Sequence, residues 1–370
     1  MSDDAPAPRV SVVMAVHDGE PYVGAAVDSI LAQQFGDLEL IVVDDGSTDR
    51  TADIVRQRDD PRVRVITNGR NLGLAPSLNV GLAEARGDLI ARLDADDVAM
   101  PQRLARQVAF MDANPHVALV GSWYTEMAAD GTPGALVKLP TQHWDLRWHL
   151  CLYSPFAHSA VLWRRALVAE RVGRYDEGLA YSMDYDLWRR IAERLEVANV
   201  SESLLYLRAH EQSMTATYGE RAREGLRMQA AHAARLLDWP TAEQLHGWPI
   251  TASESHETRL WRLYRMLISR PRDRSQVELL ADAAEVLRLH EAFVLDAGVP
   301  AEVARRQRRE VRERLARQLL WASRTARAGA HRGASGELLR AVATLAPSAF
   351  LSRESVDASI GLAARVLRRP

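Results

Sequence analysis

Short apolar segments alternate with amphipathic segments through the first quarter of this chain of 370 residues. The apolar segments are rich in β-branched residues and predict buried strands at residues 10–15, 38–43, 62–67 and 89–93. The amphipathic segments predict helices at residues 22–33, 52–58 and 74–85. Strands that are apolar along their whole length and joined by helices form a parallel sheet covered on both faces. We therefore predict an α/β fold with a mostly parallel sheet.

Polar side chains follow all four predicted strands. They are His17, Asp18, Asp44, Asp45, Asn68, Asn71, Asp94, Asp96 and Asp97. One carboxylate after a strand often only caps a helix, but capping does not require acids or amides after four strands of one sheet. Ligands of such sheets bind beyond the carboxyl ends of the strands. Because so acidic an edge repels a phosphate unless a divalent cation lies between them, the pattern predicts a metal–diphosphate site.

Asp94, Ala95 and Asp96 form an acid-x-acid triplet directly after the fourth predicted strand. Mg²⁺ and Mn²⁺ prefer oxygen ligands and commonly use one or two carboxylates together with substrate phosphates. Aspartate is common in turns, so the position of the triplet after a buried strand carries the prediction. We expect Mn²⁺ or Mg²⁺ as the cofactor.

Composition excludes several other classes of protein. The chain has 47 basic and 49 acidic residues, and this balance argues against a general nucleic-acid binder. Cys151 is the only cysteine, which excludes an intramolecular disulfide and a cysteine-based zinc site. No run approaches the roughly 18 apolar residues of a membrane span, and residues 1–8 lack the pattern of a signal peptide. A soluble cytoplasmic protein is expected.

Beyond residue 213 the strand patterns stop and helical spacing takes over. The predicted helices are at residues 220–237, 256–268, 276–295, 301–327, 336–345 and 355–369. We therefore predict a catalytic domain at residues 1–218 and an α-helical domain at residues 219–370. Residues 301–370 hold 15 arginines against 6 acidic residues, and 301–327 form a basic amphipathic helix. Packing on the helical domain is the favoured role of that helix, with anionic lipid or self-association as alternatives.

The ordered motifs of residues 9–215 resemble those of the family 2 glycosyltransferases, inverting enzymes with the GT-A fold. The matching segments are SVVMAVHD at 11–18, DDGSTD at 44–49, NLG at 71–73, NVG at 79–81, LDADD at 93–97, PFAHS at 155–159, GRYDE at 173–177, DYDLW at 184–188 and RAH at 208–210. Each segment alone is a weak signal, but their order and spacing together are specific.

The resemblance implies a donor, a reaction and a set of residue roles. The donor is a nucleotide-diphosphate sugar, with UDP the commonest nucleotide and dTDP and GDP open, and the acceptor is an unknown hydroxyl. The implied nucleotide-sugar site consists of Val16, His17, Asp44, Asp45, Asn71, Asp94 and Ala95. In it, Asp45 hydrogen-bonds the base and Asp94 binds the ribose side. Asp96 is the implied metal ligand and Asp184 the general base.

His210 matches a histidine that in some relatives helps to bind the metal or the diphosphate. Three motifs depart from the family pattern. Ala15, His17 and Asp18 stand where Pro, Tyr and Asn are usual, Met183 replaces a Glu just before Asp184, and Ser154 stands where Asn often precedes the Pro. None of these departures removes a catalytic group.

The same motifs contain residues for which a structural role is the better expectation. His149 and His158 are predicted to be structural histidines, Trp188 a core residue and Asp186 a brace of its helix. Single polar or aromatic residues at helical spacing more often pack than bind.

Three alternative functions compete with glycosyl transfer. A sugar nucleotidyltransferase needs a Gly-rich phosphate loop after the first strand, and residues 18–21 do not form one. A dinucleotide-dependent oxidoreductase needs Gly-x-Gly-x-x-Gly at the same place, which is also absent. A non-catalytic nucleotide-sugar or partner-binding module stays open, although the presence of both Asp96 and Asp184 weighs against it.

Overall fold

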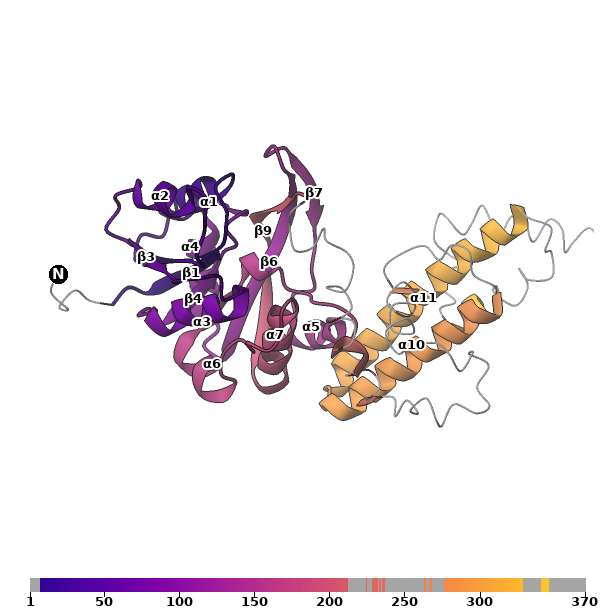
Figure 1. Cartoon of the computed structure of the whole chain (residues 1–370). Coiled ribbons are helices and arrows are strands. Elements are labelled where there is room, and N and C mark those ends of the chain that lie inside the picture. The colour runs from indigo at the N-terminus through magenta and orange to yellow at the C-terminus, as the bar shows by residue number, and fades with distance from the viewer. Residues whose placement is uncertain are drawn as a thin grey trace, which may run out of the picture. The chain divides into compact units, whose positions relative to one another are not determined.

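The computed structural model describes residues 7–211, 224, 228–231, 233, 235–236, 263, 266–267, 276–328 and 341–345 (Figure 1). The chain forms two compact units. The first comprises Met1–Leu150 and Ser154–Gly225, and the second Cys151–Tyr153 and Leu226–Pro370. The first unit thus runs past residue 218, where the sequence pattern places the domain boundary, and that boundary stays a prediction.

Four parallel strands form one half of the sheet in the first unit. They are β1 (Val10–Val16), β2 (Leu38–Asp44), β3 (Val63–Thr67) and β4 (Leu89–Arg92), in the order β3-β2-β1-β4. Every residue of β1, β2 and β4 is buried, as expected of mostly apolar strands covered on both faces. Val16 lies opposite Asp44, so β1 and β2 end side by side and their loops leave from the same edge.

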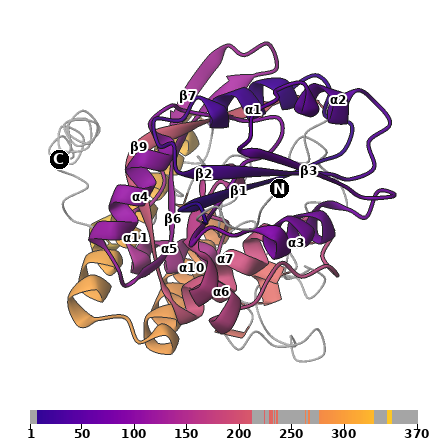
Figure 2. The ribbon, with the colours of Figure 1, turned by 90° about the vertical axis from the view of Figure 1, so that its left-hand side faces the viewer.

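Helices join these strands and cover both faces. They are α1 (Val23–Leu31), α2 (Thr51–Arg56) and α3 (Leu74–Glu84), with α1 and α2 on one face and α3 on the other (Figure 2). In α3, a Cβ on Gly81 would lie 2.6 Å from a methyl carbon of Val13, so only glycine lets this helix pack so closely on β1. The predicted strands and helices of residues 10–93 are confirmed, with ends that shift by one or two residues.

The second half of the sheet is mixed and was not predicted strand by strand. It contains β5 (Val98–Ala99), β6 (Val117–Ala128), β7 (Pro133–Val137), β8 (Leu162–Arg164) and β9 (Glu196–Ala209). The sheet continues from β4 as β8-β6-β9-β5, and β7 pairs with β6. β6 and β9 are parallel, whereas β8 runs antiparallel to β4 and β6, and β5 antiparallel to β9. This arrangement brings the end of β9 beside the segment that follows β4.

Four helices accompany this half of the sheet. They are α4 (Arg103–Ala113), α5 (His143–Leu150), α6 (Arg165–Arg171) and α7 (Met183–Arg194), and a 3₁₀ turn occupies His158–Ala160. Trp188 of α7 is completely buried, which confirms it as a core residue. The Tyr175 ring packs edge-on against it, with the ring centroids 6.2 Å apart. The aromatic contact fixes α7 against the segment before it.

The second unit contains a pair of helices, α10 (Gln276–Ala297) and α11 (Ala301–Ala328). Val311, Leu315 and Leu319 are buried along α11, so its apolar stripe is packed as predicted. The described parts of residues 220–237, 256–268 and 336–345 are also helical, whereas the helix predicted at 355–369 lies outside the described residues. No helix within the described part of the chain is both long and apolar enough to cross a membrane.

Candidate active site

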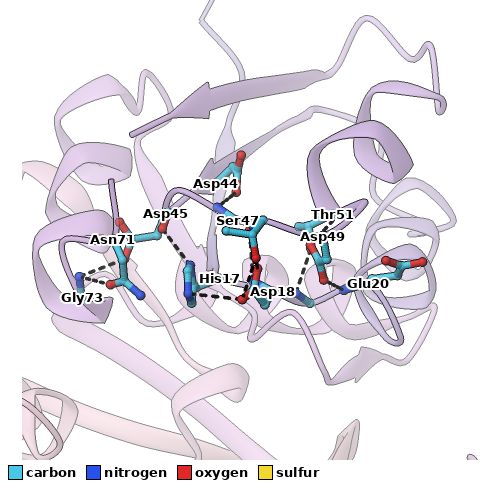
Figure 3. A network of polar contacts seen from close by, with 12 residues as sticks. His17, Asp18, Glu20, Asp44, Asp45, Ser47, Asp49, Thr51, Asn71 and Gly73 are labelled. Carbon is cyan, nitrogen blue, oxygen red and sulfur yellow. Dashed lines mark hydrogen bonds and ion pairs between the residues drawn. The ribbon is translucent and has the colours of Figure 1, made fainter. Parts of the chain in front are cut away.

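The loops that follow β1 and β2 are bonded to each other at several points (Figure 3). The Asp18 carboxylate accepts a hydrogen bond from the Thr48 N–H at 2.7 Å, and the Asp18 N–H donates to the Ser47 hydroxyl at 3.0 Å. The Gly19 N–H donates to Thr51 Oγ1 at 2.8 Å. Asp18 has a φ of +49°, a conformation that Asp and Asn tolerate better than most residues. The two loops therefore form one connected edge of the site.

Asp45, directly after β2, organises the loop that follows β3. Its carboxylate accepts hydrogen bonds from Asn68 Nδ2 at 2.8 Å and from the N–H groups of Leu72 and Gly73, both at 2.9 Å. Burial opposes ionisation of Asp45, but these hydrogen bonds outweigh it and hold its pKa below the usual range. Asn71 Oδ1 also accepts from the Gly73 N–H, at 3.0 Å. Asp45 is thus a fixed anion that supports the loop carrying Asn71.

The other residues expected at the nucleotide lie around Asp45. His17 Nδ1 is 2.9 Å from the Asp45 backbone oxygen, and the His17 side chain is 36% exposed. Asp44 accepts from the Ser47 N–H at 3.1 Å and so closes the turn after β2. A Cβ on Gly46 would lie 2.6 Å from the backbone of Arg70, so glycine is required where this turn meets the next loop. The structure brings His17, Asp44, Asp45 and Asn71 together.

Asp94 begins a strongly acidic turn, Asp94–Asp97, and is held by residues from two directions. The completely buried Arg92 forms an ion pair with it. The Ser159 hydroxyl donates to Asp94 Oδ2 at 2.7 Å and accepts from the Asp94 N–H at 2.9 Å. Burial works against ionisation here too, but the charge of Arg92 lowers the pKa of Asp94.

The end of β9 lies against this acidic turn. His210 Nε2 is 2.9 Å from Asp96 Oδ2, and Arg208 donates from Nε to the Asp96 backbone oxygen at 2.8 Å. The Arg208 N–H donates to Asp97 Oδ1, also at 2.8 Å. Burial and the charge of Asp94 raise the pKa of Asp96. Burial and the charges of Asp94 and Asp96 raise the pKa of Asp97 well above its usual value. Negative charge is therefore crowded at the turn.

The chemistry of this turn fits a divalent cation that takes only one or two ligands from the protein and the rest from substrate phosphates and water. No cluster of three or more His, Cys, Asp or Glu side chains suited to a metal ion is found among the described residues. Asp96 supplies an oxygen and His210 a nitrogen, and Ala95 lies in the turn between the two flanking carboxylates. Mg²⁺ is typically held by one or two carboxylates with substrate phosphates and water completing its shell. A cation would also offset the burial and the charge of Asp94 that together raise the pKa of Asp96.

Asp184 is the second residue of α7. Burial, and next the charge of Asp94, raises its pKa to about 6. Asp186, one half-turn later, is bonded to Arg190 at 2.7 Å and to Arg189 at 3.2 Å. Arg190 also donates to the backbone oxygens of Val172 and Arg174, so Asp186 braces the helix. Asp184 therefore lies in the electrostatic field of the acidic turn, whereas Asp186 is paired with arginines.

Sequence reasoning missed several residues of the site. Arg92 was detectable as a charge inside an otherwise apolar strand, but nothing in the sequence named Asp94 as its partner. His158, expected to be structural, packs against Trp188 and also bonds Tyr175 at 3.0 Å, with its Nδ1 3.7 Å from Asp94. Burial and the charge of Arg92 lower the pKa of His158 to about 3, so it is neutral at pH 7. His149 bonds the backbone oxygen of Asp145 in its own helix at 2.6 Å.

Motif segments far apart in the chain also meet. Asn79 of α3 donates to the Tyr175 backbone oxygen at 3.0 Å and to Glu177 at 2.9 Å, and accepts from the Tyr175 N–H at 3.2 Å. The segment before α7 is thereby tied to the parallel half of the sheet. Spacing along the chain carried no information about this contact.

Comparison with known proteins places these features in one family. The model of glycosyl transferase family 2 matches residues 11–142. An uncharacterized glycosyltransferase of Haemophilus influenzae is 30% identical over 228 residues, which cover 59% of this chain and 70% of that protein. The UDP-Gal:alpha-D-GlcNAc-diphosphoundecaprenol beta-1,3-galactosyltransferase of Escherichia coli is 30% identical over 214 residues, covering 56% and 76% of the two chains.

A solved structure shares the fold. The crystal structure of S. aureus TarS 1-349 in complex with UDP-GlcNAc superposes with a TM-score of 0.53 at 19% identity, covering 92% of this chain and 91% of that one. The resemblance at this identity concerns the fold, and it confirms the expected GT-A arrangement followed by helices.

Proposed function

The chain belongs to glycosyltransferase family 2, and we propose that it transfers a sugar, with inversion, from a nucleotide-diphosphate sugar to an acceptor hydroxyl. One observation carries this proposal. Asp184, a carboxylate with a pKa of about 6, lies in the field of an acidic turn suited to a metal–diphosphate. Inverting transfer is a single displacement that needs one base on the acceptor side and charge stabilisation on the leaving side.

The donor is proposed to bind along the edge formed by β1, β2 and their loops. His17 offers a partly exposed ring for stacking on the base, and Asp45 is a fixed acceptor beside it. Val16 and Asp44 end their strands next to these two residues. Asp94, kept ionised by Arg92, is proposed to receive the ribose hydroxyls. UDP is the proposed nucleotide because two of the three similar proteins described above, the Escherichia coli galactosyltransferase and S. aureus TarS, are named with a UDP-sugar.

Asp96 and His210 are proposed to hold Mn²⁺ or Mg²⁺. When bound, the cation supplies Lewis-acid stabilisation to the departing diphosphate. Arg208 keeps the turn in place through the Asp96 backbone oxygen and the Asp97 carboxylate. Its guanidinium in turn lies over the ring of Tyr22, 4.7 Å from the centroid.

Asp184 is proposed to take the proton from the acceptor hydroxyl. As the acceptor oxygen bonds to the anomeric carbon, the bond from that carbon to the diphosphate breaks, and the diphosphate leaves with the electron pair. A base with a pKa near 6 is largely ionised at pH 7 yet still attracts a proton. The products are expected to belong to a polysaccharide, glycolipid or other glycoconjugate.

The helical second unit is proposed to serve acceptor access, self-association or membrane docking rather than chemistry. Arg305, Arg309, Arg312, Arg314 and Arg317 are exposed on α11, and each cation near an anionic surface is worth about 1 kcal/mol. A cytoplasmic protein with peripheral contact at the inner face of the membrane is the arrangement that this surface favours.

The decisive experiment is a panel of UDP-galactose, UDP-N-acetylglucosamine, dTDP-glucose and GDP-mannose, measured with and without Mn²⁺. Metal-dependent binding by calorimetry, followed by nucleotide release, is expected for one of them. Binding without any turnover, with or without candidate acceptors, would favour a non-catalytic binding module. Binding of nucleoside triphosphate and sugar phosphate instead would favour a nucleotidyltransferase.

A further inference from the structure

Three consecutive backbone N–H groups point at one carboxylate just before α7. Ala180, Tyr181 and Ser182 donate to Glu224 at 3.2, 2.8 and 2.9 Å. Successive N–H groups that converge in this way form an anion-binding nest, and charge-assisted hydrogen bonds of this kind are the strong ones. Glu224 comes from a helical position 42 to 44 residues later in the chain and belongs to the same compact unit.

The nest lies at the entrance to the helix that carries Asp184. Ser182 is the N-cap residue of α7, but its side chain makes no capping hydrogen bond. The Glu224 carboxylate takes up the N–H groups of Ser182 and the two residues before it. Asp184 follows two residues after Ser182, so this contact fixes the backbone directly before it.

The rest of α7 is held by separate contacts. Trp188 is buried among aromatic rings, and Asp186 with Arg190 ties the helix to the Val172 and Arg174 carbonyls. These contacts involve residues of α7 from Asp186 onwards, whereas Glu224 contacts the three residues before the helix. Loss of Glu224 is therefore expected to release the segment before the helix without unfolding the helix itself.

We propose that Glu224 is a positioning residue that holds Asp184 against the acceptor side of the active site. The proposal rests on the proposed function, because it takes Asp184 to be the base. It also assigns a catalytic contribution to a residue that lies beyond residue 218, where the sequence pattern ends the catalytic domain. A displacement of about 1 Å in a catalytic group can cost on the order of 100-fold in rate.

The test compares Glu224→Ala and Glu224→Gln in the full chain with Glu193→Ala as the control. Glu193 is also bonded to an α7 residue, Arg189, at 2.7 Å, but on the far side of Asp184 from the nest. The readouts are UDP release from UDP-galactose and UDP-N-acetylglucosamine, UDP affinity by calorimetry, and hydrogen exchange of the peptide spanning residues 178–186.

For Glu224→Ala we expect UDP release to fall by about 10–100-fold while UDP affinity changes less than about twofold. Exchange should speed up in the 178–186 peptide only, and the acid limb of the pH–rate profile should move to lower pH as Asp184 becomes solvated. Glu224→Gln keeps the size of the side chain and one acceptor oxygen, so it should fall between Glu224→Ala and the wild type. Glu193→Ala should behave as the wild type in all three readouts.

Acetate provides a further check, since a small carboxylate can enter an emptied nest. Millimolar acetate, but not chloride, should partly restore the rate of Glu224→Ala. Unchanged exchange in the 178–186 peptide of both Glu224 variants would overturn the inference, as would a loss of UDP affinity parallel to the loss of rate. Normal UDP release by Asp184→Asn would instead defeat the proposed function, so the two failures are distinguishable.

Discussion

His210 and Asp96 are 114 residues apart in the chain, yet His210 Nε2 lies 2.9 Å from Asp96 Oδ2. The contact exists because β9 ends beside the acidic turn that follows β4, and Arg208 ties that strand end to Asp96 and Asp97. These two side chains are the ones proposed above to give a cation one nitrogen and one oxygen ligand.

Asp96→Ala is expected to abolish the metal dependence of donor binding while the fold is retained. The side chain is 30% exposed and its carboxylate contacts His210, so its removal is not expected to disrupt the apolar core. Calorimetry of UDP-sugar with Mn²⁺ measures the effect. Unchanged affinity in the mutant would show that the metal binds elsewhere.

Asp184→Asn is expected to lower transfer by about 10²–10⁴-fold, because the amide keeps the shape of the carboxyl group but cannot take the proton. Donor affinity should change little. Asp186→Asn is the matched control. Because Asp186 is bonded to Arg189 and Arg190, this substitution should lower stability more than turnover. A larger loss of turnover in the Asp186 variant at equal stability would reverse the two roles.

The rate of transfer is expected to fall about tenfold for each pH unit below 6, where Asp184 becomes protonated. The pH dependence of the free energy of unfolding has the opposite sign to that of the transfer rate. A carboxyl whose pKa is raised in the folded state stabilises the fold below its ordinary pKa and loses this contribution as the pH rises through 6. Asp184→Asn should therefore raise the free energy of unfolding at pH 7, by an amount on the order of 1–3 kcal/mol. Urea unfolding at pH 5 and pH 7 measures it; a mutant less stable than the wild type at pH 7 would contradict the raised pKa.

Arg92→Met is expected to lower the free energy of unfolding by about 3 kcal/mol, because it leaves the Asp94 charge without its buried partner. Adding Asp94→Asn should recover part of that loss by removing the stranded charge. Urea unfolding of the two single variants and the double variant gives the coupling energy. Strictly additive effects would mean that the ion pair contributes nothing.

The sequence predicted which strand ends lie together in the parallel half of the sheet, but not how the later motifs meet them, for a physical reason. Asp45 and Asp94 follow buried, mostly apolar strands, and the parallel pairing of such strands with β1 brings their ends to one edge. The later strands are mixed in direction and reach their partners over long separations, as β6 and β9 do. Hydrophobic periodicity does not encode those pairings, so Asp184 and His210 could be proposed only from the family resemblance.

Arg92 and Glu224 make contacts that hydrophobic periodicity does not predict. The first is a buried charge within a strand, and its guanidinium is paired with Asp94 and also donates to the Leu93 backbone oxygen. The second accepts hydrogen bonds from backbone N–H groups, which almost every residue has, so residue types do not predict the contact. Both contacts depend on tertiary proximity.

The bonds between the loops after β1 and β2 have a consequence for redesign of donor preference. Asp18 accepts from Thr48, Gly19 donates to Thr51, and Glu20 donates its N–H to Asp49. Residues that share hydrogen bonds in this way respond to substitution non-additively. In a library that varies one loop while the other keeps its native residues, most variants would lose hydrogen bonds between the two loops. Exchange of both loops as one cassette, taken together from a single relative, is the route by which a new nucleotide preference should be introduced.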